Sequence, residues 1–460
     1  MTTTVLVLYI IAFALFIYGL MGLTGPRTAV RGNLIAATGM GIAVLATVLI
    51  PGVSNWALIV LGVVLGTVLG VPAARQVKMT AMPQMVALFN GVGGGAVALI
   101  AWVEFNSTAG FAEEPGYVMV ASLFGAIVGS VSFWGSLVAF GKLQELIPGR
   151  PISLGKPQQL VNALVLVAAL VCAVAIGLGG DTQLLILGTL IFAAALGLLV
   201  VLPIGGADMP VVISLLNALT GLSAAAAGLA LDNTAMIVAG MIVGASGSIL
   251  TNLMAKAMNR SIPAIVAGGF GGGGVPGARE LGDKTVRETN AADAAVQMAY
   301  ANQVVVVPGY GMAVAQAQHT VRDMAKLLED KGVEVKYAIH PVAGRMPGHM
   351  NVLLAEADVP YEQLKEMDEI NGEFNRTDVA LVIGANDVTN PAARNDPSSP
   401  IHGMPILNVD ESKSVIVLKR SMNPGFAGIE NELYYSPSTA MLFGDAKSSV
   451  ESVIEELKAL

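Results

Sequence analysis

A glycine-rich turn between an apolar strand and a helix is the first feature of this sequence that could do chemistry. The valine run Gln303–Val307 predicts a buried parallel strand, and a helix is predicted over Ala313–Asp330. Between them the chain reads Pro308-Gly309-Tyr310-Gly311-Met312-Ala313-Val314. Glycines here allow a tight turn and the close approach of a pyrophosphate to the helix N-terminus, where unpaired N–H groups favour anions. Because valine stands at the third glycine position of the fingerprint, the motif alone indicates a dinucleotide only with moderate specificity.

The end of the second predicted strand indicates which dinucleotide. Sites for NAD usually place an Asp or Glu there, to bind the ribose 2′-hydroxyl. After the predicted strand Val333–Ile339 the chain instead reads His340-Pro341-Val342-Ala343-Gly344-Arg345, without a carboxylate. A later strand ends in Lys419-Arg420-Ser421, whose two cations and hydroxyl suit a 2′-phosphate. A solvated basic turn is the alternative, but in an acidic domain this cluster indicates NADP(H).

Two further polar clusters follow predicted strands. Gly384-Ala385-Asn386-Asp387 follows Val379–Ile383, and Gly444-Asp445-Ala446-Lys447 follows Met441–Phe443. Strands are also predicted at Ile406–Val409 and Val415–Leu418. The alternation of strands and helices predicts an α/β Rossmann-like domain with a doubly wound parallel sheet, whose carboxyl edge would carry these clusters. Asp387 is the carboxylate expected nearest the cofactor, with a turn-stabilising role as the alternative.

Residues 1–260 have a composition that predicts a membrane bundle. They contain 9 Lys or Arg and 7 Asp or Glu, against 16 and 26 in residues 261–460. The mean hydropathy of the whole chain is +0.68. About nine apolar runs are long enough to cross a bilayer, at residues 4–23, 34–50, 55–73, 83–103, 117–141, 159–178, 183–202, 209–230 and 234–255.

The basic residues of this bundle predict its orientation. If the spans alternate in direction, all nine Lys and Arg fall on one side of the membrane. The positive-inside rule then puts the N-terminus outside and the C-terminal domain in the cytoplasm.

Polar residues inside the spans are few. Asn90, Asn217 and Ser246 lie within the fourth, eighth and ninth predicted spans, and Asp208 lies at the mouth of the eighth. Interhelical hydrogen bonds and a helix N-cap are the alternatives to a functional role. No Lys, Arg, His, Asp or Glu occupies the middle of any predicted span, so the bundle is not expected to contain its own relay of titratable side chains.

The sequence therefore predicts three parts: a transmembrane domain over 1–260, a glycine-rich linker over 261–289 and a nucleotide-binding domain over 290–460. The single cysteine, Cys172, excludes an internal disulfide framework and a cysteine-based metal site, and no metal site is predicted. The acidic balance of the second domain argues against a nucleic-acid partner.

Long stretches of the chain resemble the β subunit of the proton-translocating NAD(P) transhydrogenase. The resemblance rests on the glycine-rich turn and on His340–His349, Met350–Ala357, Gly384–Asp387, Lys419–Asn423, Gly444–Lys447, Gly205–Val212 and Lys256–Arg260. It implies an enzyme that transfers hydride between NAD(H) and NADP(H), coupled to proton translocation. Inward proton flow would drive the reduction of NADP⁺ by NADH.

The resemblance also implies partners and site residues. NAD(H) would bind a separate α subunit that brings further membrane helices. Two copies of this chain would form a homodimer within a larger assembly in the bacterial cytoplasmic (inner) membrane. The implied proton path and its coupling involve Asp387, Asp208, Asn90, Asn217, Ser246 and Arg260. The implied NADP(H) contacts are Gly309, Tyr310, Gly311, Met312, Ala313, Val314, His340, Ala343, Gly344, Arg345, Gly384, Asn386, Asp387, Lys419, Arg420, Ser421, Gly425, Phe426, Ala427, Gly444, Asp445 and Ala446.

This chain departs from some relatives at two positions. Asn90 stands where they have a histidine, and Phe426 stands where they have a tyrosine. We therefore expect the missing titratable group of the channel to come from a helix of the α subunit. A nucleotide-gated membrane transporter or channel is the alternative function. A membrane-anchored soluble dehydrogenase is a third, which leaves the nine spans unexplained.

Overall fold

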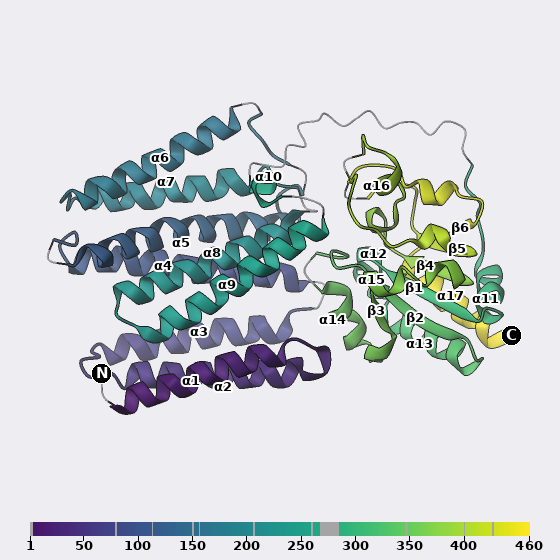
Figure 1. Ribbon diagram of the computed structural model, residues 1–460, viewed down its shortest axis with the longest axis horizontal. Helices are drawn as coiled ribbons and strands as arrows, with labels where there is room; N and C mark the ends of the chain where they lie inside the picture. Colours follow the sequence, from purple (N-terminus) through teal and green to yellow (C-terminus); the bar gives the residue numbers. More distant parts are fainter. Residues whose placement is uncertain are drawn as a thin grey trace. The chain divides into compact units, whose positions relative to one another are not determined.

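The computed structural model describes residues 3–78, 81–112, 114–149, 151–155, 157–205, 208–258, 261–266, 285–345, 348–399, 401–425 and 427–460. The chain divides into two compact units, with the division between residues 252 and 270. The first unit consists of long helices and the second is an α/β domain (Figure 1).

Nine helices in the described part of the chain are long and apolar enough to cross a membrane, which confirms the predicted bundle. The helices of the first 266 residues are α1 (Thr3–Gly22), α2 (Pro26–Val48), α3 (Trp56–Gln76), α4 (Met82–Ser107), α5 (Gly116–Leu143), α6 (Gln158–Gly177), α7 (Gln183–Val201), α8 (Met209–Ala230), α9 (Thr234–Ala257) and the short α10 (Ile262–Val266).

Two helix ends differ from the predicted spans in a way that matters. Helix α2 begins at Pro26 and not near residue 34, so Arg27 and Arg31 lie in its first two turns. Proline suits this first helical position because its missing N–H has no helical partner there. Helix α4 continues to Ser107 and not to 103, which places Glu104 inside a helix.

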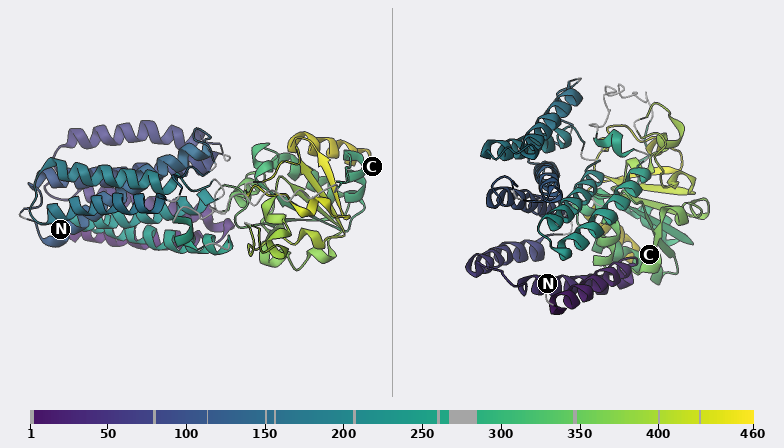
Figure 2. Two further views of the ribbon diagram at one scale, coloured as in Figure 1. Left: turned by 90° about the horizontal axis from the view of Figure 1, so that it is seen from above. Right: turned by 60° about the vertical axis from the view of Figure 1, so that its left-hand side comes forward.

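Small residues allow the central helices to pack closely. A Cβ on Gly94 of α4 would lie 2.8 Å from the carbonyl oxygen of Gly129 on α5, so only glycine fits this contact. Helix α5 also packs against α7 and α8, among the long helices drawn in Figures 1 and 2. The seam between α4 and α5 therefore holds the middle of the bundle together.

The second unit contains a six-stranded parallel sheet in the order β3-β2-β1-β4-β5-β6, which confirms the doubly wound fold. The strands are β1 (Gln303–Pro308), β2 (Glu334–Ile339), β3 (Leu364–Glu366), β4 (Val379–Ile383), β5 (Ser414–Lys419) and β6 (Thr439–Phe443). The strand order reverses between β1 and β4, and ligands of such sheets bind at that point of the carboxyl edge.

Helices cover one face of the sheet more fully than the other. Helices α11 (Ala291–Ala299) and α13 (Gln318–Asp330) pack against α17 (Ala446–Ala459) (Figure 1). The other core layer is formed by short helices and turns, where Phe374, Leu407 and Tyr434 pack with strand residues. The remaining helices are α12 (Tyr310–Val314), α14 (His349–Glu356), α15 (Met367–Ile370) and α16 (Ala392–Asn395).

Three local predictions were wrong. Ile406–Val409 is not a strand; Leu407 N–H donates to Val388 O, and Ile406 O accepts from the Asn371 side chain. The short strand β3 was missed because its three residues, one apolar and two charged, carry no apolar alternation. The predicted helix Ala313–Asp330 is broken into α12 and α13 where Gln316 takes a φ of 51°, which ends a right-handed helix.

Part of the predicted linker joins the sheet. Arg287 O accepts from Met441 N–H at 2.7 Å, and Thr289 N–H donates to Met441 O at 2.9 Å. Residues 287–289 thus pair with the outer edge of β6. The glycines of the predicted linker lie in 267–284, outside the described residues.

Asp378 ties together the amino ends of β1 and β4, and we predict that it makes the domain acid-sensitive. It accepts hydrogen bonds from the N–H groups of Asn302 and Gln303 and from Lys413 Nζ at 2.7 Å. The bond from Lys413, followed by those from Asn302 and Gln303, lowers the pKa of Asp378 from 3.8 to about 2. Its stabilising effect is therefore present above pH 3.8 and is lost as the pH falls toward 2.

Thermal unfolding of the full chain in detergent would measure this effect. We expect Asp378→Asn to cost about 1 kcal/mol at pH 6, because solvent screens the Lys413 pair, and to cost less at pH 3. An equal loss at both pH values would contradict the role of the carboxylate.

Candidate functional site

The turns that follow β1 and β4 meet at the switch point of the sheet. Gly309 N–H donates to Ile383 O at 2.9 Å, and Gly311 N–H donates to Gly384 O at 3.0 Å. A Cβ on Gly309 would lie 2.4 Å from the backbone of Ala385, and one on Gly311 would lie 2.7 Å from Gly384 Cα. The two glycines of the motif are thus required by a contact between two turns of the protein.

Tyr310, Arg345 and His349 join the turn after β1 to the loop after β2. The guanidinium carbon of Arg345 lies 4.2 Å from the centroid of the Tyr310 ring, a cation–π contact. Arg345 N–H donates to His349 Nδ1 at 3.0 Å, and the ring centroids of Tyr310 and His349 are 6.3 Å apart. Gly344, with a φ of 104°, lets the loop pass close to the His349 ring. This arrangement fixes one cation at the carboxyl edge.

The two histidines of this loop are held neutral. Burial lowers the pKa of His340 to about 4, and burial together with the Arg345 charge lowers the pKa of His349 to about 4. His340 Nε2 lies 2.8 Å from Pro405 O, which can only accept, so the partners assign the proton to Nε2. Neither imidazole is expected to be in its cationic form near neutral pH.

Asn386 and Asp387, after β4, organise the loop that follows β5. Asp387 Oδ2 accepts from Ala427 N–H at 3.0 Å. Asn386 Oδ1 accepts from Tyr434 Oη at 2.9 Å, and Asn386 O accepts from Asn431 Nδ2 at 3.0 Å. The predicted Asp387 is therefore a loop-holding carboxylate. Sequence reasoning missed Asn431 and Tyr434, which lie far along the chain and belong to no recognisable motif.

The structure brings the predicted Lys419 to the same place. Lys419 Nζ donates to Asn423 O and lies 5.5 Å from the Tyr434 ring centroid. Burial lowers the pKa of Lys419, and the Asp387 carboxylate opposes that shift. Arg420 and Ser421 are exposed at the end of β5. The two cations of the cluster therefore differ: Lys419 is half-buried and holds a loop, whereas Arg420 is open to solvent.

The remaining predicted contacts differ in how far they are accessible. Met312, Ala313 and Ala343 are buried, whereas Val314 is exposed. Gly444 N–H donates to Lys419 O, and Asp445 caps α17 by accepting from Lys447 N–H at 3.0 Å. Asp445 therefore has a structural task already. Gly425 lies against Asn386 and Asp387, and Phe426 lies outside the described residues.

In the membrane unit, Asn90 is the centre of a polar cluster that joins three helices. Its Nδ2 donates to Ser136 Oγ at 2.9 Å and to Ser132 Oγ at 3.3 Å on α5. Ser132 Oγ lies 2.5 Å from Thr220 Oγ1 on α8 and 3.1 Å from Leu216 O. This cluster confirms interhelical hydrogen bonding at Asn90.

Of the other predicted channel residues, the structure describes Asn217, Asp208 and Ser246, which lie on or beside α8 and α9. Asn217 is partly buried on α8, one residue after Leu216. Asp208 is 7% exposed and immediately precedes α8, but its side chain does not cap the helix. Ser246 is exposed and donates within its own helix to Val243 O. Arg260 lies outside the described residues.

Comparisons with known proteins match the chain over nearly its whole length. The family model described as NAD(P) transhydrogenase beta subunit matches residues 5–456. The chain is 50% identical over 456 residues to the NAD(P) transhydrogenase subunit beta of Rhodospirillum rubrum, covering 98% of each chain. The corresponding protein of a named strain of the same species matches equally well.

The contact between the two turns predicts that alanine destabilises the protein much more at Gly384 than at Gly332, although both glycines have a positive φ. An alanine Cβ at Gly384, whose φ is 65°, would lie 2.4 Å from Gly311 Cα. Gly332 has a φ of 88° and open space around it. We expect Gly332→Ala to cost about 1 kcal/mol and Gly384→Ala about 2 kcal/mol more, because backbone strain and a backbone clash add there. Thermal unfolding of the full chain measures both, and equal losses would contradict the requirement.

Proposed function

Because this chain belongs to the family of NAD(P) transhydrogenase beta subunits, we propose that it binds NADP(H) and carries most of the proton path of such an enzyme. In this proposal hydride passes between NAD(H), bound on an α subunit, and NADP(H), bound here. Inward protons drive the reduction of NADP⁺ by NADH. The observation that carries the choice of NADP(H) is the pair Lys419 and Arg420 at the end of β5, together with a β2 end that carries no carboxylate.

The residues at the carboxyl edge fit a dinucleotide with a third phosphate. The β1 turn lies at the switch point, where such cofactors bind. Arg345 is held there by Tyr310, and the exposed Arg420 is available for a charge-assisted bond to a 2′-phosphate. The nicotinamide itself supplies the hydride chemistry, so the protein has only to bind and orient it. This agrees with two histidines that are neutral and buried.

Asp387 is proposed to couple protonation to cofactor binding. Its carboxylate holds Ala427 N–H and faces the Lys419 charge, so both contacts weaken if it takes up a proton. The segment between Lys419 and Ala427 would then be released from the β4 turn. In this way a protonation event could change the affinity for NADP(H) without any step at the reacting carbon.

The membrane bundle is proposed to work with a partner. The α subunit would contribute further helices and a titratable group near Asn90, and two copies of this chain would pair within a larger assembly. Asp208, Asn217, Ser246 and Arg260 are proposed to belong to the channel and its cytoplasmic mouth. The proposed location is the bacterial cytoplasmic membrane, with the N-terminus outside.

Membrane vesicles that contain this chain and its α partner test the activity directly. We expect NADH to reduce an NADP analogue, and an uncoupler to change the rate. A chain that binds no NADP(H) would contradict the proposal. A nucleotide-gated transporter would bind the nucleotide without transferring hydride.

Arg420 provides a test of cofactor choice. We predict that Arg420→Ala weakens binding of NADPH roughly 10- to 100-fold, since a charged hydrogen bond contributes about 1.5–3 kcal/mol, and leaves the weak binding of NADH unchanged. Titration of the full chain in detergent with each nucleotide measures this. Lys331→Ala, which removes a cation from the turn between α13 and β2, is the matched control. An equal loss for both nucleotides would show that Arg420 does not read the 2′-phosphate.

A further inference from the structure

The antiparallel seam between α4 and α5 carries a polar position toward each end. At one end Asn90 Nδ2 donates to Ser136 Oγ at 2.9 Å. Glu104 stands 14 residues further along α4, and Ser122 stands 14 residues before Ser136 on α5. Because both helices advance 1.5 Å per residue, Glu104 and Ser122 face each other at the same register, about 21 Å from Asn90.

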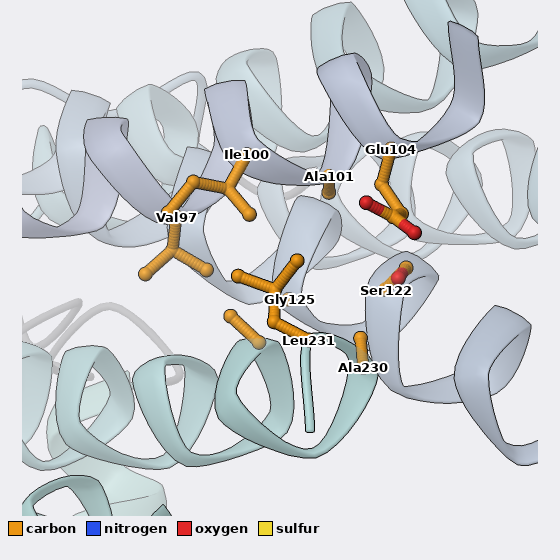
Figure 3. Close-up of a pocket in the computed structure, with 9 residues that line it drawn as sticks. Val97, Ile100, Ala101, Glu104, Ser122, Gly125, Ala230 and Leu231 are labelled. Atoms are coloured by element: carbon orange, nitrogen blue, oxygen red, sulfur yellow. The ribbon is translucent and has the colours of Figure 1, made fainter. Parts of the chain in front are cut away.

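Glu104 and Ser122 line one narrow crevice between α4, α5 and the end of α8. Figure 3 shows the Glu104 carboxylate pointing toward Ser122. Ser122 is buried and Glu104 is partly exposed. The crevice leaves no room for a water molecule. The rest of its lining carries no polar side chain and consists of Val97, Ile100, Ala101, Gly125, Ala227, Ala230 and Leu231. A charged side chain is costly in such surroundings and marks a position of functional interest.

Hydroxyl groups lie between the two ends of the seam. Ser132 Oγ and Thr220 Oγ1 are 2.5 Å apart, and Ser223 Oγ donates to Thr220 O at 2.8 Å. The carbonyl oxygen of Ser223 is 3.7 Å from the position of a Cβ on Gly125, which lines the crevice. Together with Ser122, these side chains place hydroxyls at intervals along α5 and α8 between the Asn90 cluster and Glu104, and we call these four hydroxyls the hydroxyl line.

The charged groups around Glu104 are few in the part of the chain that the structure describes. Glu114 lies two residues before the start of α5, at the same end of the seam as Glu104. Asp232 follows the last turn of α8. Helix α5 contributes the neutral Ser122.

We propose that Glu104 is a proton-binding group of the bundle. Its carboxylate takes a proton from the aqueous phase at the carboxyl end of α4 and passes it to the hydroxyl line through Ser122. Uptake gives a neutral carboxylic acid and release restores the carboxylate, so charge and protons balance. The proposal rests on the proposed function, since it assumes proton translocation, and it deepens that function by naming a titratable residue of this chain.

The experiment compares variants in vesicles that contain the full complex with the α partner. Hydride transfer, internal acidification and NADPH binding are measured for each. We expect Glu104→Gln to lower proton translocation roughly 100-fold, the size of a lost acid–base group, with NADPH binding unchanged. Glu104→Asp keeps translocation but shifts its pH profile. Glu145→Gln, which removes an acidic charge just after the opposite end of α5, should behave as the wild type.

The outcomes separate the two proposals. Wild-type vesicles without hydride transfer would overturn the proposed function. Wild-type vesicles that translocate protons, with Glu104→Gln doing so equally fast, would overturn the role of Glu104 alone. If Glu104→Gln does not assemble, Ser122→Ala removes the facing hydroxyl with little change in volume. An unaltered rate and pH profile in both Ser122→Ala and Glu104→Asp would then refute the proposal.

Discussion

Close contact between backbones, with no side chain between them, is the interaction on which both units depend. In the sheet domain Gly311 and Gly384 bring the turns after β1 and β4 together, and a single methyl group at either would strike backbone atoms. In the bundle Gly94 and Gly129 do the same for α4 and α5. A backbone cannot move aside as a flexible side chain can, so these positions tolerate no larger residue.

In the sheet domain this contact determines what can gather at the carboxyl edge. Once the β1 and β4 turns touch, Asp387 lies beside the loop that leaves β5 and binds Ala427. Lys419, at the end of β5, reaches the same loop through Asn423. A carboxylate and a cation from different strands thus restrain one segment. A change in either charge therefore acts on a loop at the edge where the ligands of such sheets bind.

In the bundle the close seam has an electrostatic consequence. Lipid offers no hydrogen-bond partners, so the polar groups of α4 must find theirs on α5 and α8. Asn90 does so through Ser132 and Ser136. The same register places Glu104 opposite Ser122 at the other end. A seam that is needed for packing therefore also aligns the few groups that could exchange a proton.

The sequence by itself determined the elements with a strong periodic or compositional signal. Apolar runs of sufficient length specified nine helices, and the valine-rich strands with their glycine turns specified a doubly wound sheet, because both signals are local. The cluster Lys419-Arg420-Ser421 and the loop residue Asp387 were recognisable because strand ends mark the ligand edge. The short β3, the non-strand conformation of Ile406–Val409 and the break at Gln316 were not, since tertiary contacts override weak local preference there.

Only the tertiary structure decided which of these residues act together. It assigned the motif glycines to a contact between turns, Asp445 to a helix cap and Asp387 to a loop hydrogen bond. It also showed that α4 extends beyond its predicted end at residue 103, which places Glu104 in the bundle opposite Ser122. Such pairings join residues from separate elements, and their geometry depends on packing that no stretch of sequence records locally.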